Sequence, residues 1–210
     1  MQRTGLLGGS FNPAHPGHRR IARGAIEHLG LDELWLMVSP GNPLKDQSGD
    51  MAPLHARLAS ARKIARRNRI RATAIERELG TRYTAETLLK LVRRYPKRRF
   101  IWVMGADNLA DFHRWRNWRD IARTVPIAVI ARPGYDGHAR TGKAWAWLRH
   151  FVRPASQARY WTNWRPPALV LLRFLPDPAS ATLMRRGNPG WHVSIKPVSQ
   201  RDPVTRRLIA

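Results

Sequence analysis

The chain has 210 residues, 43% of them hydrophobic, which is enough to bury the core of one globular domain. It contains no cysteine, which excludes disulfides and thiolate metal sites, and it has no apolar run near the roughly 18 residues that a membrane span needs. Lys and Arg number 38 against 14 Asp and Glu, a formal charge of +24. The basic residues are spread along the chain and form no tail. This distribution favours a solvated basic surface over a nucleic-acid-binding function.

The first third of the chain alternates between strand and helix patterns. Apolar residues recur at helical spacing on one side of two segments, and short apolar runs separate these segments. The predicted elements are a strand at 3–8, a helix at 18–29, a strand at 33–38, a helix at 53–65 and a strand at 70–75.

The same alternation continues beyond residue 80. Asp107 follows a glycine at the end of an apolar run, and we expect it to cap the next helix. The predicted elements are a helix from 84 that ends before Pro96, a strand at 99–104, a helix near Asp107, a helix at 117–123 and a strand at 125–130.

The stretch from 135 to 166 is less regular and rich in tryptophan, arginine and proline. We expect a helix followed by a loop that covers one edge of the sheet or packs on a partner chain, and a locally packed subdomain is an equal alternative. A sixth strand at 168–174 and a short helix at 180–186 follow.

Strands that alternate with helices predict an α/β fold, a Rossmann-like doubly wound parallel sheet of five to six strands. The absence of repeats and linkers indicates a single domain over 1–210, with 135–166 as a less regular segment within it. In such sheets ligands bind at the carboxyl ends of the strands. The loops that follow the strands should therefore line one rim.

Residues 8–18, Gly-Gly-Ser-Phe-Asn-Pro-Ala-His-Pro-Gly-His, lie where the first strand passes into the first helix. Free backbone N–H groups and the helix dipole favour an anion at such a junction. A tight turn alone would explain the glycines. His15 and His18 could be metal ligands, but the sequence offers no clear third ligand.

The whole motif resembles the (H/T)xGH signature of the nucleotidyltransferase relatives of class I aminoacyl-tRNA synthetases. Residues 178–186, Pro-Ala-Ser-Ala-Thr-Leu-Met-Arg-Arg, resemble the (I)SSTxxR motif of the same enzymes, although alone they would suit a Ser-capped helix. Three internal segments, 75–88, 100–115 and 131–135, look like the "E…SYTxxTL", "GxDxL…(F)xxW" and "RPGY" segments of bacterial nicotinate-nucleotide adenylyltransferases.

The resemblance implies roles for the matched residues. The implied catalytic residues are His15, His18 and Arg185. The implied ATP-binding residues are Gly8, Gly9, Ser10, Phe11, His15, His18, Gly105, Asp107, Ser180, Thr182 and Arg185. The implied substrate-binding residues are Asn12, Lys45, Tyr83, Thr84, Trp115 and Arg132, among which Trp115 would stack on the pyridine ring, Arg132 would hold the mononucleotide phosphate, and no protein metal site is expected.

Two of these residues have a simpler interpretation, and several positions depart from the family pattern. Trp115 could be a core tryptophan and Lys45 a surface cation. Asn12 replaces the commoner Asp, Ser10 replaces Thr, and Ala181 removes one hydroxyl of the second motif, while Leu44 stands where relatives often have His.

The resemblance implies transfer of the adenylyl group of ATP to nicotinate mononucleotide, with Mg²⁺ bound alongside ATP and no dedicated protein cage. Sister enzymes acting on nicotinamide mononucleotide or phosphopantetheine are alternatives, and His15 argues against the second because those enzymes usually have Thr there. A basic nucleic-acid-binding module is the alternative from another class. We expect a cytoplasmic protein without a signal peptide or membrane partner, and the sequence leaves homo-oligomerisation open.

Overall fold

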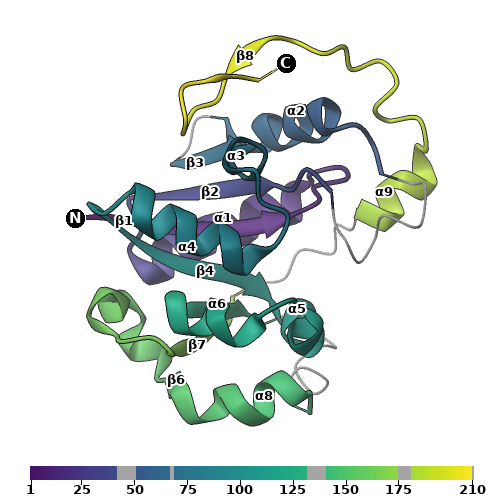
Figure 1. The fold of residues 1–210 in the computed structure, drawn as a ribbon. Coiled ribbons are helices and arrows are strands. Elements are labelled where there is room, and N and C mark those ends of the chain that lie inside the picture. The colour runs from purple at the N-terminus through teal and green to yellow at the C-terminus, as the bar shows by residue number, and fades with distance from the viewer. Residues whose placement is uncertain (42–50, 67–68, 132–140, 175–180, 210) are drawn as a thin grey trace.

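A parallel sheet forms the centre of the fold (Figure 1). The computed structural model describes residues 1–41, 51–66, 69–131, 141–174 and 181–209. Within these ranges the sheet has seven strands in the order β3-β2-β1-β4-β5-β7-β6. The strands are β1 (Gln2–Gly9), β2 (Glu33–Val38), β3 (Ile70–Thr73), β4 (Arg98–Gly105), β5 (Ile127–Ile130), β6 (Val152–Arg153) and β7 (Leu169–Leu172).

All six predicted strands are present, and the doubly wound parallel fold is confirmed. The count of five to six strands is too low by one, because β6 adds a seventh strand beside β7. Val152 and Arg153 are both exposed, so this edge strand has no apolar run that the sequence could reveal.

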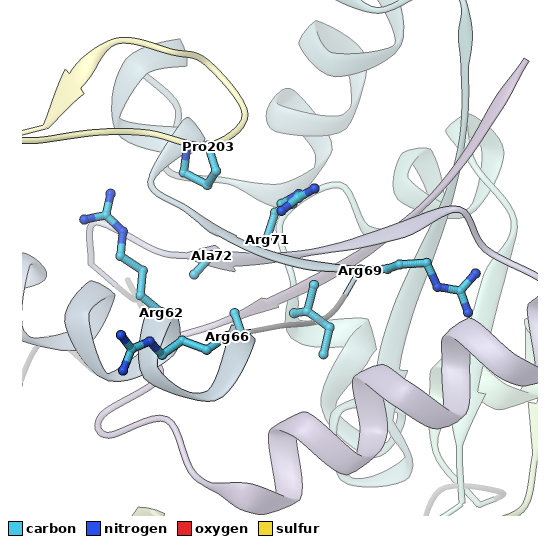
Figure 2. Close-up of a pocket in the computed structure, with 8 residues that line it drawn as sticks. Arg62, Arg66, Arg69, Arg71, Ala72 and Pro203 are labelled. Carbon is cyan, nitrogen blue, oxygen red and sulfur yellow. The ribbon is translucent and has the colours of Figure 1, made fainter.

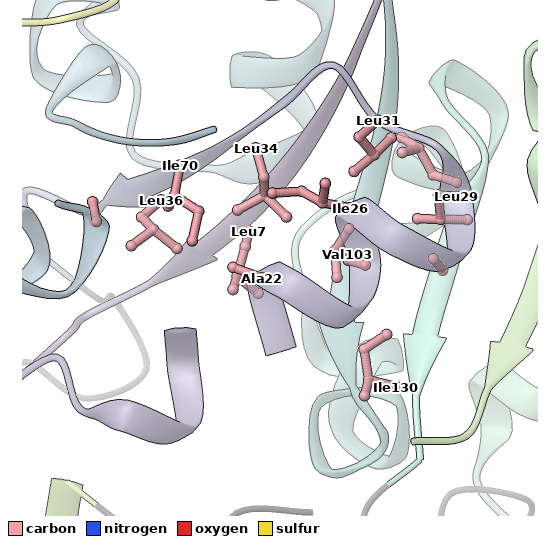
Figure 3. Packing of buried hydrophobic residues seen from close by; sticks show 14 of the residues in the cluster. Leu7, Ala22, Ile26, Leu29, Leu31, Leu34, Leu36, Ile70, Val103 and Ile130 are labelled. Atoms are coloured by element: carbon pink, nitrogen blue, oxygen red, sulfur yellow. The ribbon is translucent and has the colours of Figure 1, made fainter. Parts of the chain in front are cut away.

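One face of the sheet is covered by α1 (Pro16–Leu29), α2 (Leu54–Ala65) and the 3₁₀ helix η4 (Ala155–Asn163). Figure 3 shows the packing, in which Ala22 and Ile26 of α1 lie against strand residues such as Leu7 and Leu34. The indole N–H of Trp161 donates to the carbonyl of Leu29 at 3.0 Å and so ties η4 to the end of α1.

The opposite face is covered by helices from the middle of the chain. Trp35, Phe100 and Trp102 project from the strands toward this face and form its apolar cluster with the helices. The helices are α3 (Ile75–Leu79), α4 (Thr84–Arg94), α5 (Ala106–Asp111), η2 (Phe112–Arg114), α6 (Trp118–Thr124), α8 (Lys143–Leu148) and η3 (Arg149–Phe151). Because both faces are covered, β2, β5 and most of β4 are apolar and buried, as the continuous runs predict.

Several predicted helices differ in detail from the structure. The first begins at Pro16, because proline suits the first helical position, where its missing N–H costs nothing. The short helix α3 was not predicted. In the 135–166 stretch, the expected helix is present as α8, but the expected loop contains β6 and η4, which cover the β7 edge and the end of α1.

The C-terminal part of the chain returns to the β3 edge (Figure 1). After α9 (Ala181–Gly187), it forms a two-stranded hairpin of β8 (Gln200–Arg201) and β9 (Leu208–Ile209). The carboxylate of Asp202 in this hairpin is 1% exposed. It accepts hydrogen bonds from the Thr73 hydroxyl at 2.9 Å and from the Ala74, Val204 and Thr205 amides at 3.0, 2.8 and 3.1 Å.

No described helix is both long enough and apolar enough to cross a membrane.

We expect Asp202→Ala to lower the free energy of unfolding by about 2–4 kcal/mol, because the buried Thr73 and Ala74 donors lose their acceptor. Urea unfolding would measure this. The control is Asp120→Ala, which removes an exposed carboxylate paired only with Arg123 and should change the stability by less than about 0.5 kcal/mol. Equal effects of the two variants would contradict the anchoring role of Asp202.

Candidate active site

The loop after β1 has a constrained backbone. Phe11 is 2% exposed and adopts φ of 49°, a left-handed conformation that is strained for a bulky residue. His15 is the N-cap of α1 in extended conformation, and Pro16 begins the helix. The loop thus turns sharply where β1 passes into α1, and the His18 N–H donates to the His15 carbonyl at 2.9 Å.

His15 and His18 lie side by side, with ring centroids 3.8 Å apart. The backbone N–H of His15 donates to Nδ1 of His18 at 3.2 Å. Because Nδ1 accepts this bond, neutral His18 carries its proton on Nε2, where it can donate to an anion. No acidic residue lies in the first turn of α1, so nothing there opposes the positive end of the helix dipole.

The second motif reaches the first through Arg185. Its Nη1 donates to the backbone carbonyl of Asn12 at 2.6 Å, across 173 positions of sequence. Thr182 lies on the same helix, α9, with an exposed side chain. Figure 1 shows α9 at the end of the sheet where β1 hands over to α1. The two sequence motifs therefore meet at one rim, and Ser180 lies outside the described residues.

Arg57 of α2 joins the loops that follow β1 and β2. Its side chain is buried, and its guanidinium donates to the carbonyls of Ser10 at 2.9 Å, Ser39 at 2.7 Å, Pro40 at 3.1 Å and Ala52 at 2.8 Å. Arg57 is a functional candidate that no sequence motif includes. The sequence could have predicted its role, because Arg57 falls within the apolar stripe of the predicted 53–65 helix. An arginine in such a stripe needs buried hydrogen-bond acceptors.

The glycines at the ends of β1 and β4 have local structural reasons. A Cβ on Gly8 would lie 2.5 Å from Cη2 of Trp102, so only glycine leaves room for the indole. Gly105 is the N-cap of α5, and the expectation that Asp107 caps this helix is wrong. The helix begins two residues earlier than expected, which places Asp107 in its first turn, where a carboxylate still suits the positive end of the dipole.

Trp115 and Tyr83 come from different elements and lie near each other. Trp115 follows η2 and is half-buried, edge-on to Trp102 with ring centroids 6.2 Å apart. Tyr83 is the N-cap of α4, directly before Thr84, and the guanidinium carbon of Arg116 lies 4.5 Å from its ring centre. The contact between Arg116 and Tyr83 links the segment of Trp115 to the start of α4, and these two aromatic residues form a candidate aromatic site. Lys45 and Arg132 lie outside the described residues.

The buried carboxyl group of Glu76 in α3 is hydrogen-bonded to the first turns of α4. Glu76 of α3 is 7% exposed, and burial raises its pKa to about 7, although the hydrogen bond that it accepts from the Thr87 hydroxyl at 3.2 Å lowers it. Thr87 also shares a hydroxyl contact of 2.8 Å with Thr81. The network ties α3 to the first turns of α4.

A cavity of about 500 Å³ lies away from these residues, between the end of α2, the start of β3 and Pro203 (Figure 2). Four arginines line it, yet their guanidinium groups point in different directions. Arg62 donates to Gln200, Arg69 to the carbonyl of Leu31, and Arg71 pairs with Glu33. None of the residues singled out from the sequence lines this cavity, so the rim is the better candidate site.

In the described part of the chain, no three His, Asp or Glu side chains gather where they could hold one metal ion.

Comparisons with known proteins agree on one family. The family model described as "Cytidylyltransferase-like" matches residues 6–187. The chain is 58% identical to the "Probable nicotinate-nucleotide adenylyltransferase" of Erythrobacter litoralis over 99% of its own length and 94% of the relative's. It is 50% identical to the protein of the same name from Gluconobacter oxydans, over 87% of this chain and 93% of the relative.

The fold also resembles solved structures at low sequence identity. The nicotinic acid mononucleotide adenylyltransferase of Plasmodium falciparum, complexed with APC, superposes with a TM-score of 0.62 at 16% identity, over 89% of this chain and 83% of that chain. The same protein complexed with NaAD gives a TM-score of 0.60 at 15% identity, with the same coverage. This likeness shows a shared fold.

We expect Arg57→Met to lower the free energy of unfolding by about 2–4 kcal/mol, because buried carbonyls lose their donors. Amide hydrogen exchange should quicken in peptides covering 8–12 and 37–41, which end in the loops that Arg57 holds. Arg93→Met, an exposed arginine of α4, is the matched control. Unchanged exchange in both peptides would disprove the role of Arg57.

We expect Glu76→Gln to remove one component of the pH dependence of stability. The folded-state pKa of about 7 lies above the usual 4.5, so the folded chain holds the extra proton between these values. The free energy of unfolding of the unaltered protein should therefore fall as pH rises from about 4.5 to 7, by at most about 3 kcal/mol. Thermal melts from pH 4 to 8 would measure the loss of this slope, with exposed Glu86→Gln as the control. The same slope in all three proteins would contradict the assignment.

Proposed function

Because the chain belongs to the cytidylyltransferase-like family, and within it to the nicotinate-nucleotide adenylyltransferases, we infer that it transfers the adenylyl group of ATP to nicotinate mononucleotide. The products are deamido-NAD and pyrophosphate, and the reaction is a step of NAD biosynthesis. The curated relatives at 48–58% identity carry this name over nearly the whole chain, and the solved structure with NaAD shares the fold.

The observation that carries the site assignment is the hydrogen bond from Arg185 to the Asn12 carbonyl. It brings the C-terminal basic helix against the His15 and His18 loop, so donors from both ends of the chain surround one space. We assign the ATP phosphates to this space, held by His15, His18 and Arg185 with amides of the 8–11 loop. The further ATP contacts proposed are Ser180, Thr182, Gly105 and Asp107.

Nicotinate mononucleotide is assigned to the aromatic site of Trp115 and Tyr83. The half-buried Trp115 offers a ring face for a flat pyridine. The amides at the start of α4, after Tyr83 and at Thr84, suit its carboxylate, because α4 has no side-chain cap. Asn12, Lys45 and Arg132 complete the proposed substrate contacts, with Arg132 on the mononucleotide phosphate.

The mechanism follows from charge and alignment. An oxygen of the mononucleotide phosphate attacks the α-phosphorus of ATP, forming one P–O bond. The bond to the β-phosphate oxygen breaks, and its electron pair leaves with pyrophosphate. The attacking phosphate is already anionic, so no general base is required. His18, through Nε2–H, and Arg185 then stabilise charge on the bridging and leaving oxygens.

Magnesium enters this proposal with ATP. The residues described at the rim are mainly neutral or cationic donors, which fits an ion held chiefly by phosphate oxygens and water. When bound, the ion would screen the charge of the triphosphate. A cytoplasmic location and the absence of a nucleic-acid partner are further parts of the proposal.

The substrate assignment is tested by measuring pyrophosphate release with ATP and either nicotinate or nicotinamide mononucleotide. We expect a higher kcat/KM with the acid. An equal or higher value with the amide would overturn the preference for the acid.

The site assignment is tested by His18→Ala, which should lower kcat by at least about 10²–10³-fold, because a donor to the transition state is lost. The melting temperature should change little. His150→Ala, at an exposed histidine of η3, should keep normal turnover. Near-normal turnover of His18→Ala would sink the assignment.

A further inference from the structure

The indole N–H of Trp102 is a hydrogen-bond donor without an acceptor in the described part of the chain. The residue lies on β4 and is 2% exposed. Its indole Nε1 is buried and has no acceptor among the described residues. Buried donors without partners are rare and costly in folded proteins, so each one needs a reason.

The indole of Trp102 leans toward the substrate rim. In the sheet register Trp102 pairs with Leu6 of β1. Its six-membered ring, however, lies against Gly8, two residues further toward the carboxyl end of β1. Cη2 and Cζ2 of the ring would stand 2.5 and 3.1 Å from a Cβ on Gly8. Cζ3, on the other side of the ring, would stand 3.5 Å from the same point, so the tip of the ring reaches Gly8 and the side that carries Nε1 is slightly the nearer of the two.

Residues of the proposed pyridine site lie around Trp102. Trp115 stands edge-on to Trp102 at 6.2 Å, and Ala85, in the first turn of α4, belongs to the same apolar cluster. The contact between Arg116 and Tyr83 joins the turn after Trp115 to the start of α4. A donor-only group therefore lies in the apolar cluster that also contains residues of the first turns of α4.

We propose that the indole N–H of Trp102 donates a hydrogen bond to the carboxylate of nicotinate mononucleotide and so helps to select the acid over the amide. This inference rests on the proposed function and adds a specificity-determining residue to it.

Two donor groups on one substituent explain the selectivity. A carboxylate has two acceptor oxygens and can satisfy both the α4 amides and the Trp102 N–H. A carboxamide has one acceptor oxygen, so one donor would face its NH₂ group. A site that leaves a buried donor unpaired discriminates strongly against the wrong substrate.

The variant Trp102→Phe removes the donor and keeps an aromatic ring. We expect KM for nicotinate mononucleotide to rise about 10- to 100-fold, the range for a hydrogen bond to a charged group. KM for ATP and KM for nicotinamide mononucleotide should change by less than about threefold, which is within the effect of one neutral hydrogen bond.

Trp35→Phe is the matched control. Trp35 lies on β2 and, like Trp102, pairs with Leu6 and packs in the same cluster, but its N–H already donates to Glu33 at 2.8 Å. This variant should lose stability and leave KM for nicotinate mononucleotide unchanged.

Indole ¹H–¹⁵N spectra give a readout besides activity. The cross-peak absent from Trp102→Phe identifies the Trp102 N–H. Nicotinate mononucleotide should shift it downfield, and nicotinamide mononucleotide should shift it less. A peak that does not move, or equal KM changes in the Trp35 and Trp102 variants, would overturn the inference. If the unaltered protein shows no turnover with nicotinate mononucleotide, the proposed function itself is wrong, and this inference falls with it.

Discussion

The buried guanidinium of Arg57 is the constraint on which the candidate site depends. Hydrophobic packing fixes the strands, but it is non-directional and cannot fix the loops that leave them. Arg57 supplies direction, because its planar donors hold the Ser10 carbonyl of one loop and the Ser39 and Pro40 carbonyls of the next. The strained backbone at Phe11 lies directly after Ser10, whose carbonyl Arg57 holds. A cation inside the apolar face of α2 thus sets the shape of the rim where anions are proposed to bind.

The sheet topology explains why the two proposed substrates lie side by side. β1 is central, with β2 on one side and β4 on the other. The chain after β1 passes to the α1 face, whereas the chain after β4 passes to α5 on the opposite face. The rim therefore divides between β1 and β4, where a crevice is expected in doubly wound sheets. His18 and Arg185 lie on one side of this division, and Trp115 and Trp102 lie on the other.

Much of this arrangement could be predicted from the sequence, and the failures have physical causes. Apolar runs such as 33–38 and 99–104 identified most of the sheet, because a strand covered on both faces is apolar over most of its length. β6 escaped because a two-residue exposed edge strand carries no such pattern. The β8–β9 hairpin was not predicted, because the buried carboxylate of Asp202 anchors it and no apolar stripe marks it in the sequence. The two motifs predicted a shared site, and Arg185 does contact Asn12 of the first motif. They could not reveal Arg57, whose partners are distant in sequence, or the donor of Trp102 that has no acceptor among the described residues.

The contact between Arg185 and Asn12 also has a consequence for the order in which the chain is made. Asn12 is among the first residues to leave the ribosome, and Arg185 follows only after the last strand of the central sheet, β7, has been synthesised. The last residue of the central sheet is therefore synthesised before the arginine of the proposed phosphate-binding site. A product that stops short of α9 contains the strands of the central sheet without Arg185, and so lacks the hydrogen bond that joins the two ends of the proposed site.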